Sequence, residues 1–256
     1  MSTPAPTRLS VLATEVVDEA LGRGHRRDPV RAGTGGPAGN ARLTAWTGLL
    51  LLVLFVAELL TLLDVGGLIS WHLAIGALLV PPALLKTGST GWRLVRYYLG
   101  DADYGQAGPP VPLLRALGPL VVISTLALLG SGLLLVLIGP DPARTTLFTL
   151  PLLRVDYVTL HQAVFIAWAT VTGAHLLARL VPAVKLTVPG PGRGAVPGNA
   201  SRALVVLLSV ALAALCAVLV VSWGHDWRTE RGPHDGPRAS ADSQATPVSR
   251  ASSAVT

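Results

Sequence analysis

The sequence predicts an all-α integral membrane protein, built as a helical bundle with five transmembrane helices, four in a core and one beside it. Three observations predict this fold class. Mean hydropathy is +0.56, 51% of the 256 residues are apolar and only 13% are charged, about half the charged share of a soluble domain. Five apolar segments each approach the roughly 20 residues that cross a bilayer. Polar tails flank these segments on both sides.

The first 42 residues form a polar, basic tail that we expect in the cytoplasm. Apolar residues recur in it at helical spacing and predict a short amphipathic helix on the membrane surface or on a partner protein; they are Leu9, Leu12, Val16, Val17 and Leu21. A disordered tail is the alternative. Because the first apolar run starts near Leu43, we expect no signal peptide.

Residues 43–223 are predicted to form the transmembrane domain. Its five segments must be helical, because an unpaired backbone amide in lipid costs several kcal/mol. The predicted helices are Thr44–Leu63, Leu68–Lys86, Leu113–Ile138, Tyr157–Val181 and Ala203–Trp223. Gly66 and Gly67 predict a tight turn between the first two, and Pro81 with Pro82 predicts a kink in the second. Asp101 and Asp103 are interpreted as loop residues.

The orientation follows from the distribution of basic residues. With the N-terminus in the cytoplasm, 14 of the 20 lysines and arginines fall on the cytoplasmic side and 6 outside. This bias predicts an N-in, C-out, multi-pass protein of the cell membrane. It also explains the net charge of +6 through topology and membrane lipid, so that no nucleic-acid partner is expected. Residues 224–256, rich in Ser, Ala, Pro and Arg, predict a disordered extracytoplasmic tail.

Two histidines inside predicted helices are the main candidate site residues. His72 and His161 each lie four residues into a helix that enters from the outside, so both imidazoles are expected roughly 6 Å below the outer interface. Ionisable groups inside a membrane usually have a function. Two imidazoles at equal depth on facing helices are the ligand set of a bis-histidine haem. Small residues that would make room for a porphyrin are Gly76, Gly130, Ser131 and Gly132.

His175 follows His161 by 14 residues, which places it on the same face of the helix in the inner leaflet. The residue 14 positions after His72 is Lys86. The two helices therefore carry matching pairs, two histidines on one and a histidine with a lysine on the other. Arg93 and Arg96 lie where they would meet lipid phosphates or the propionates of an inner-leaflet haem.

Glu58 is expected at the same depth as His72 and His161, and this position is compatible with several roles. It would complete a non-haem metal site with His72 and His161, accept the second ring N–H of a ligating histidine, or relay protons. It would otherwise bond its own helix or reach toward the interface. The remaining polar candidates are interpreted as structural: His25, His225 and His234 as surface residues, and Cys216 as a small apolar residue.

Two stretches resemble a known family. WHLAIGALLVPPALLKTGSTGWRLVRYYLGD and LHQAVFIAWATVTGAHLLARL resemble bacterial membrane cytochromes b of the b561 and ferric-reductase-like kind. More narrowly, the chain looks like small multi-pass actinobacterial proteins. The resemblance covers roughly residues 44–181. It implies an outer-leaflet haem b with His72 and His161 as axial ligands, and it assigns His175 to an inner-leaflet site. Lys86 stands where a two-haem member would have histidine, so one haem or two remain open.

The sequence therefore predicts a membrane-embedded b-type cytochrome-like subunit. It would carry electrons across or within the membrane between a donor, such as a quinone, and a redox partner protein. No dinucleotide-binding glycine motif is present, so those partners would have to supply and accept the electrons. Whether the chain is an enzyme stays open. The alternative is a non-catalytic membrane protein, either a permease for a metal or small solute or a structural subunit.

Overall fold

The structure is a computed structural model that describes residues 8–23, 28–108, 112–151, 153–187 and 196–229. These residues are helical except for one short β-hairpin and the connecting turns. Four segments are long and apolar enough to cross a membrane: Gly36–Tyr98, Leu114–Ile138, Tyr157–Thr187 and Asn199–Trp223. The all-α fold and its membrane character are thereby confirmed.

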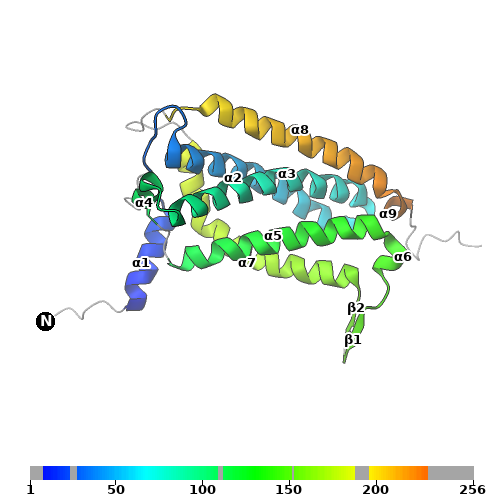
Figure 1. The fold of residues 1–256 in the computed structure, drawn as a ribbon. Coiled ribbons are helices and arrows are strands. Elements are labelled where there is room, and N and C mark those ends of the chain that lie inside the picture. The colour runs from blue at the N-terminus through cyan, green and yellow to red at the C-terminus, as the bar shows by residue number, and fades with distance from the viewer. Residues whose placement is uncertain (1–7, 24–27, 109–111, 152, 188–195, 230–256) are drawn as a thin grey trace, which may run out of the picture.

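The first of these segments consists of two antiparallel helices. Helix α2 (Gly36–Thr61) is followed by a 3₁₀ turn, η1 (Leu62–Asp64), and by helix α3 (Val65–Tyr98), which returns alongside α2 (Figure 1). At one end the Lys86 ammonium group donates to the carbonyl of Thr44 at 3.1 Å. At the other end Thr61 Oγ1 lies 3.0 Å from His72 Nδ1. The predicted hairpin is therefore present within one continuous helical segment.

The chain reverses slightly earlier than the two glycines predict. Asp64 is the N-cap of α3, and its side chain accepts a hydrogen bond from the backbone N–H of Gly67 at 3.0 Å. A carboxylate at this position satisfies one of the free amides in the first helical turn. Gly66 and Gly67 consequently lie inside the first turn of α3, and the reversal takes place over Leu62–Asp64.

Helix α3 is longer than predicted, because it continues past Lys86 to Tyr98. Its 34 residues span about 51 Å at 1.5 Å per residue, more than the roughly 30 Å of the hydrocarbon core. Pro81 and Pro82 lie buried within it, and its one residue with non-helical dihedral angles is Leu68. The departure from helical dihedral angles is therefore near the start of α3 and not at Pro81 and Pro82, where the sequence predicted a kink.

The segment beyond α3 is folded, which corrects the interpretation of Asp103 as a loop residue, whereas Asp101 lies in the connection before the next helix. Asp101 caps helix α4 (Ala102–Ala107) and accepts from the backbone N–H groups of Asp103 and Tyr104. Arg96 contacts the Asp101 carboxylate at 2.5 Å. Burial alone would raise the pKa of Asp101, but the Tyr104 N–H and the guanidinium of Arg96 hold it below its ordinary value.

Arg93 likewise has a protein partner, because its guanidinium contacts the Asp28 carboxylate at 2.6 Å. Arg31 reaches Asp103 at 2.6 Å. These ion pairs connect the segment before α2 to the end of α3 and to α4. Arg93 and Arg96, which we assigned to lipid phosphates or haem propionates, therefore form ion pairs that hold this end of the fold together.

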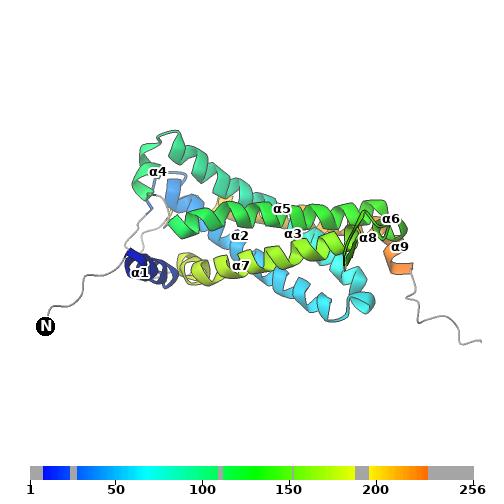
Figure 2. The ribbon, with the colours of Figure 1, turned by 90° about the horizontal axis from the view of Figure 1, so that it is seen from below.

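The remaining elements complete an elongated bundle (Figures 1 and 2). Helix α7 contacts both α5 and α2, and α8 packs along α3. A two-stranded hairpin and two short helices lie at one end of the bundle. In chain order the elements are α5 (Pro112–Ile138), α6 (Pro140–Ala143), β1 (Phe148–Leu150), β2 (Leu153–Val155), α7 (Tyr157–Thr187), α8 (Asn199–Trp223) and α9 (His225–Thr229).

Helix α1 (Arg8–Ala20) lies across the opposite end of the bundle (Figure 1). Glu19 forms an ion pair with Arg179 of α7 at 2.9 Å. Nearby, Lys185 donates to the carbonyl of Leu21 at 2.8 Å. The short helix predicted near the N-terminus is thus present and attached to the end of α7. Of the predicted disordered tail, residues 225–229 form α9, and residues 230–256 lie outside the described part of the chain.

Candidate functional site

A cavity of about 250 Å³ lies in the half of the bundle that is remote from α1. Residues from α2, α3, α5 and α7 form its walls, and Val220 of α8 and Trp227 of α9 complete the lining. Most lining side chains are aliphatic or aromatic. The polar ones are Glu58, His72, His161 and Gln162. An apolar cavity with a few convergent polar groups is the usual form of a binding site for a small molecule or cofactor.

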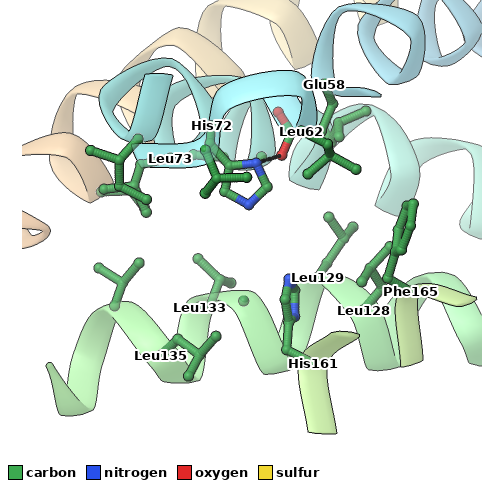
Figure 3. A pocket seen from close by; sticks show the side chains of 18 of the residues that line it. Glu58, Leu62, His72, Leu73, Leu128, Leu129, Leu133, Leu135, His161 and Phe165 are labelled. Carbon is green, nitrogen blue, oxygen red and sulfur yellow. Dashed lines mark ion pairs between the residues drawn. The ribbon is translucent and has the colours of Figure 1, made fainter. Parts of the chain in front are cut away.

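His72 enters the cavity from α3, and side chains of α2 contact its ring on the side that faces away from the cavity (Figure 3). Its Nδ1 atom lies 3.0 Å from Glu58 Oε1 and 3.0 Å from Thr61 Oγ1. The Thr61 hydroxyl donates its own proton to the backbone carbonyl of Glu58 at 2.6 Å. Both oxygens are thus acceptors toward Nδ1, and the ring proton is assigned to that nitrogen.

His161 enters from α7, opposite His72 (Figure 3). Its Nδ1 atom lies 2.8 Å from Ser131 Oγ of α5. The Ser131 hydroxyl donates to the carbonyl of Leu128 at 3.0 Å, so its oxygen accepts from the histidine. The ring proton of His161 is therefore also assigned to Nδ1.

A neutral imidazole with its proton on Nδ1 carries an unprotonated lone pair on Nε2, which is the form that ligates a metal. Within the described part of the chain, no hydrogen bond reaches Nε2 of His72 or of His161. A metal-ligating histidine commonly donates its other N–H to a carboxylate or another oxygen. Glu58, Thr61 and Ser131 occupy that position here.

Two glycines make room beside these side chains. A Cβ atom at Gly132 would lie 3.3 Å from Cε1 of His161, and one at Gly76 would lie 3.5 Å from Oε1 of Glu58. The first distance is tighter than ordinary van der Waals contact. A Cβ atom at Gly130 would meet nothing within 4 Å. Of the glycines that the sequence singled out, Gly132 is therefore the one at which an added Cβ atom would press against the His161 ring.

Three aromatic side chains form part of the cavity wall. Phe55 and Trp168 have ring centroids 4.6 Å apart, and Phe165 lies 6.0 Å from Trp168. The Trp168 indole donates to Thr125 Oγ1 at 3.1 Å. Flat, apolar side chains of this kind suit a flat aromatic ligand.

Helix α9 contributes to the other end of the cavity through Trp227, whose indole donates to the carbonyl of Leu135 at 3.0 Å. This bond attaches α9 to the end of α5.

The carboxylate of Glu58 is only partly satisfied. Its Oε1 atom faces His72, whereas Oε2 is buried without a hydrogen-bond partner. The side chain is 16% exposed. A buried polar atom without a partner calls for an explanation, and a ligand group or a water molecule in the cavity would provide one.

His175 does not line this cavity. Its Nδ1 atom is buried without a partner, as is Oγ1 of Thr172 one helical turn away. Lys86 bonds the carbonyl of Thr44 in the same half of the bundle. The assignment of His175 to a separate, inner-leaflet site stays a prediction.

The structure also bears on the alternative of a non-haem metal site. Among the described residues, no three side chains of His, Cys, Asp or Glu come together as a set that could hold a metal ion. Glu58 contacts His72 through Nδ1, the nitrogen that faces away from the cavity (Figure 3). The geometry places the carboxylate behind the histidine, where it orients the ring.

Comparison of the chain with protein-family models, with curated proteins and with solved structures gave no match.

Sequence reasoning named both histidines and Glu58 but missed the hydroxyl groups behind them. Thr61 follows Glu58 by three residues, and Ser131 precedes Gly132. Ser131 entered only as a small residue. A hydroxyl group at the predicted depth of each histidine was the available signal. For Ser131 it indicates a hydrogen bond to His161 only once α5 is known to face α7.

Proposed function

We propose that this protein is a membrane cytochrome b-like electron carrier, in which His72 and His161 would hold the iron of one haem b. The observation that carries this proposal is that both imidazoles line one apolar cavity and that both Nδ1 atoms are bonded to oxygen atoms of the protein. Two lone pairs on Nε2 are then available from opposite walls, as bis-histidine ligation requires.

The residues of the site suit the group that they would hold. His72 and His161 would bind the iron, and Glu58, Thr61 and Ser131 would fix the orientation of the two rings. Phe55, Phe165 and Trp168 would contact the macrocycle. When bound, the haem would supply one-electron redox chemistry. The protein would exclude water from the iron and set its potential through ligands and burial.

We further propose that the chain crosses the membrane five times, with the N-terminus in the cytoplasm. The antiparallel pairing of α2 and α3 supports two crossings within the segment Gly36–Tyr98. In this orientation α1 lies at the inner surface of the cell membrane and the cavity lies in the outer half. A quinone or a protein would deliver electrons, and a redox partner would accept them. The excess of lysine and arginine on the cytoplasmic side supports the placement of the N-terminus in the cytoplasm.

The direct test is a reduced-minus-oxidised absorption spectrum of the protein purified from haem-replete cells. We expect a Soret band and paired α and β bands on reduction. Elemental analysis of the same sample separates the alternatives, because iron with protoporphyrin supports the cytochrome. Zinc or manganese instead would support a metal permease or metal site. A colourless sample without metal would support a structural role and contradict the proposal.

A further inference from the structure

The β-hairpin between α6 and α7 has one apolar face and one polar face. Strands β1 and β2 pair antiparallel with Phe148 opposite Val155, Thr149 opposite Arg154 and Leu150 opposite Leu153. Residues directly opposite each other in an antiparallel pair point to the same face, and successive residues alternate. Thr149 and Arg154 therefore form one face. The other face consists entirely of apolar side chains, namely Phe148, Leu150, Leu153 and Val155.

This apolar face is largely uncovered by the protein. Phe148 is 53% exposed, Leu150 49% and Leu153 50%, whereas Val155 is 7% exposed. Only the part of the face next to the start of α7 is thus buried in the bundle. Three large apolar side chains continue from that buried point outward without protein contacts that cover them.

The position of the hairpin indicates what covers it. It extends sideways from the end of the bundle where α7 begins, across the direction of the long helices (Figure 1). In a protein whose long helices cross a bilayer, an element in this position runs parallel to the membrane plane at its surface. Leu160, in the first turn of α7, is also exposed, at 44%.

We propose that this hairpin lies in the interface of the outer leaflet, with Phe148, Leu150 and Leu153 inserted among the lipids and with Thr149 and Arg154 facing the headgroups and water. A stable protein partner needs an interface of about 20–30 residues on each side, and three exposed side chains fall far short of that. A lipid surface sets no such minimum, because the strength of membrane binding scales with the apolar area that is buried.

The backbone sets the depth of insertion. Among the residues that the structure describes, the two strands pair only with each other, so the outer edge of each strand exposes N–H and C=O groups. Such groups are not tolerated in the hydrocarbon core. They are hydrated in the headgroup region, so the hairpin inserts its side chains but not its backbone. This inference depends on the membrane orientation of the bundle and not on the binding of haem.

The test uses single cysteines in the full-length protein, on a background in which Cys216, the one cysteine of the chain, is replaced by Ala. Cysteine is placed at Phe148, Leu150 or Leu153 on one face and at Thr149 or Arg154 on the other. Each variant is reconstituted in vesicles of phosphatidylcholine and phosphatidylglycerol and labelled with an environment-sensitive fluorophore. Quenching by brominated lipid and by aqueous iodide is then measured.

We expect an alternating pattern along each strand. Labels on the apolar face should be quenched several-fold more by brominated lipid than labels on the polar face, and iodide should show the opposite order. Because a bulky label could disturb so short a hairpin, the unlabelled cysteines are also titrated with a charged, membrane-impermeant maleimide. The apolar-face cysteines should react several-fold more slowly in vesicles.

Equal lipid quenching and equal maleimide rates on the two faces would overturn the proposal. Protection that appears only at high protein-to-lipid ratio would also overturn it, because it would identify a second copy of the chain as the occupant.

Discussion

The Nδ1 atom of His72 lies 3.0 Å from Oε1 of Glu58, which joins a ring near the start of α3 to a carboxylate near the end of α2. The two residues are brought together by the reversal at Leu62–Asp64. The contact fixes the ring proton on the side away from the cavity. It also makes Glu58 a positioning residue in the proposed site.

Replacing Glu58 by Ala should weaken haem binding about 10–100-fold, the usual cost of losing a partner behind a metal-ligating histidine. Glu58→Gln retains an amide oxygen that can accept from Nδ1 and should keep most of the affinity. The measurement is the rate of haem transfer from each variant to an apo-globin acceptor. Equal transfer rates for all three proteins would show that Glu58 does not orient His72.

Replacing Ser131 by Ala should have a similar effect through His161, because the Nδ1 proton of that ring loses its acceptor. The matched control is Ser124→Ala on the same helix, since among the described residues the Ser124 hydroxyl bonds only the Val121 carbonyl. We expect about tenfold weaker haem retention for Ser131→Ala and no change for the control. Equal retention in the two variants would remove Ser131 from the site.

A methyl group at Gly132 should displace the His161 ring, because its Cβ would lie 3.3 Å from Cε1. Gly130→Ala is the control, as nothing lies within 4 Å of the added atom. We expect Gly132→Ala to lower haem content or shift the midpoint potential while the control matches the wild type. Should both variants behave alike, the space beside His161 would have no functional role.

The start of α7, which positions His161, should respond to acid through Asp156. Its Oδ1 accepts from the backbone N–H of Thr159 at 2.7 Å, and this bond lowers the pKa of Asp156 below its ordinary value. A lowered pKa in the folded state stabilises the protein above the ordinary value of about 3.9. That stabilisation is lost as pH falls through the lower, folded value.

We therefore expect Asp156→Ala to cost about 1 kcal/mol of stability at pH 7 and to differ little from the wild type below the lowered, folded pKa of Asp156. Asp156→Asn, which keeps an acceptor, should retain most of the stability at neutral pH. Thermal unfolding in detergent at neutral and at strongly acidic pH measures the difference. A destabilisation of Asp156→Ala that is independent of pH would show that the carboxylate charge has no part in capping α7.

Hydropathy and periodicity predicted the helical membrane fold because lipid allows few alternatives to a helix. They placed His72 and His161 at one depth because depth follows directly from position along a helix. They did not predict the N-cap at Asp64 or the continuation of α3 to Tyr98, because a side-chain hydrogen bond and ion pairs to Asp28 and Asp101 decide those boundaries. Ser131 was missed as a partner because its role depends on which face of α5 meets α7.

Ligation of one haem by the two cavity histidines is decided by the haem content and spin state of the purified protein and of its His72→Ala and His161→Ala variants. His225→Ala is the control, because that side chain is 67% exposed. We expect low-spin haem in the wild type and in the control, and loss of haem or conversion to a high-spin form in either cavity variant. Low-spin haem that persists unchanged in both cavity variants, or a wild-type protein without haem, would contradict bis-histidine ligation at this site.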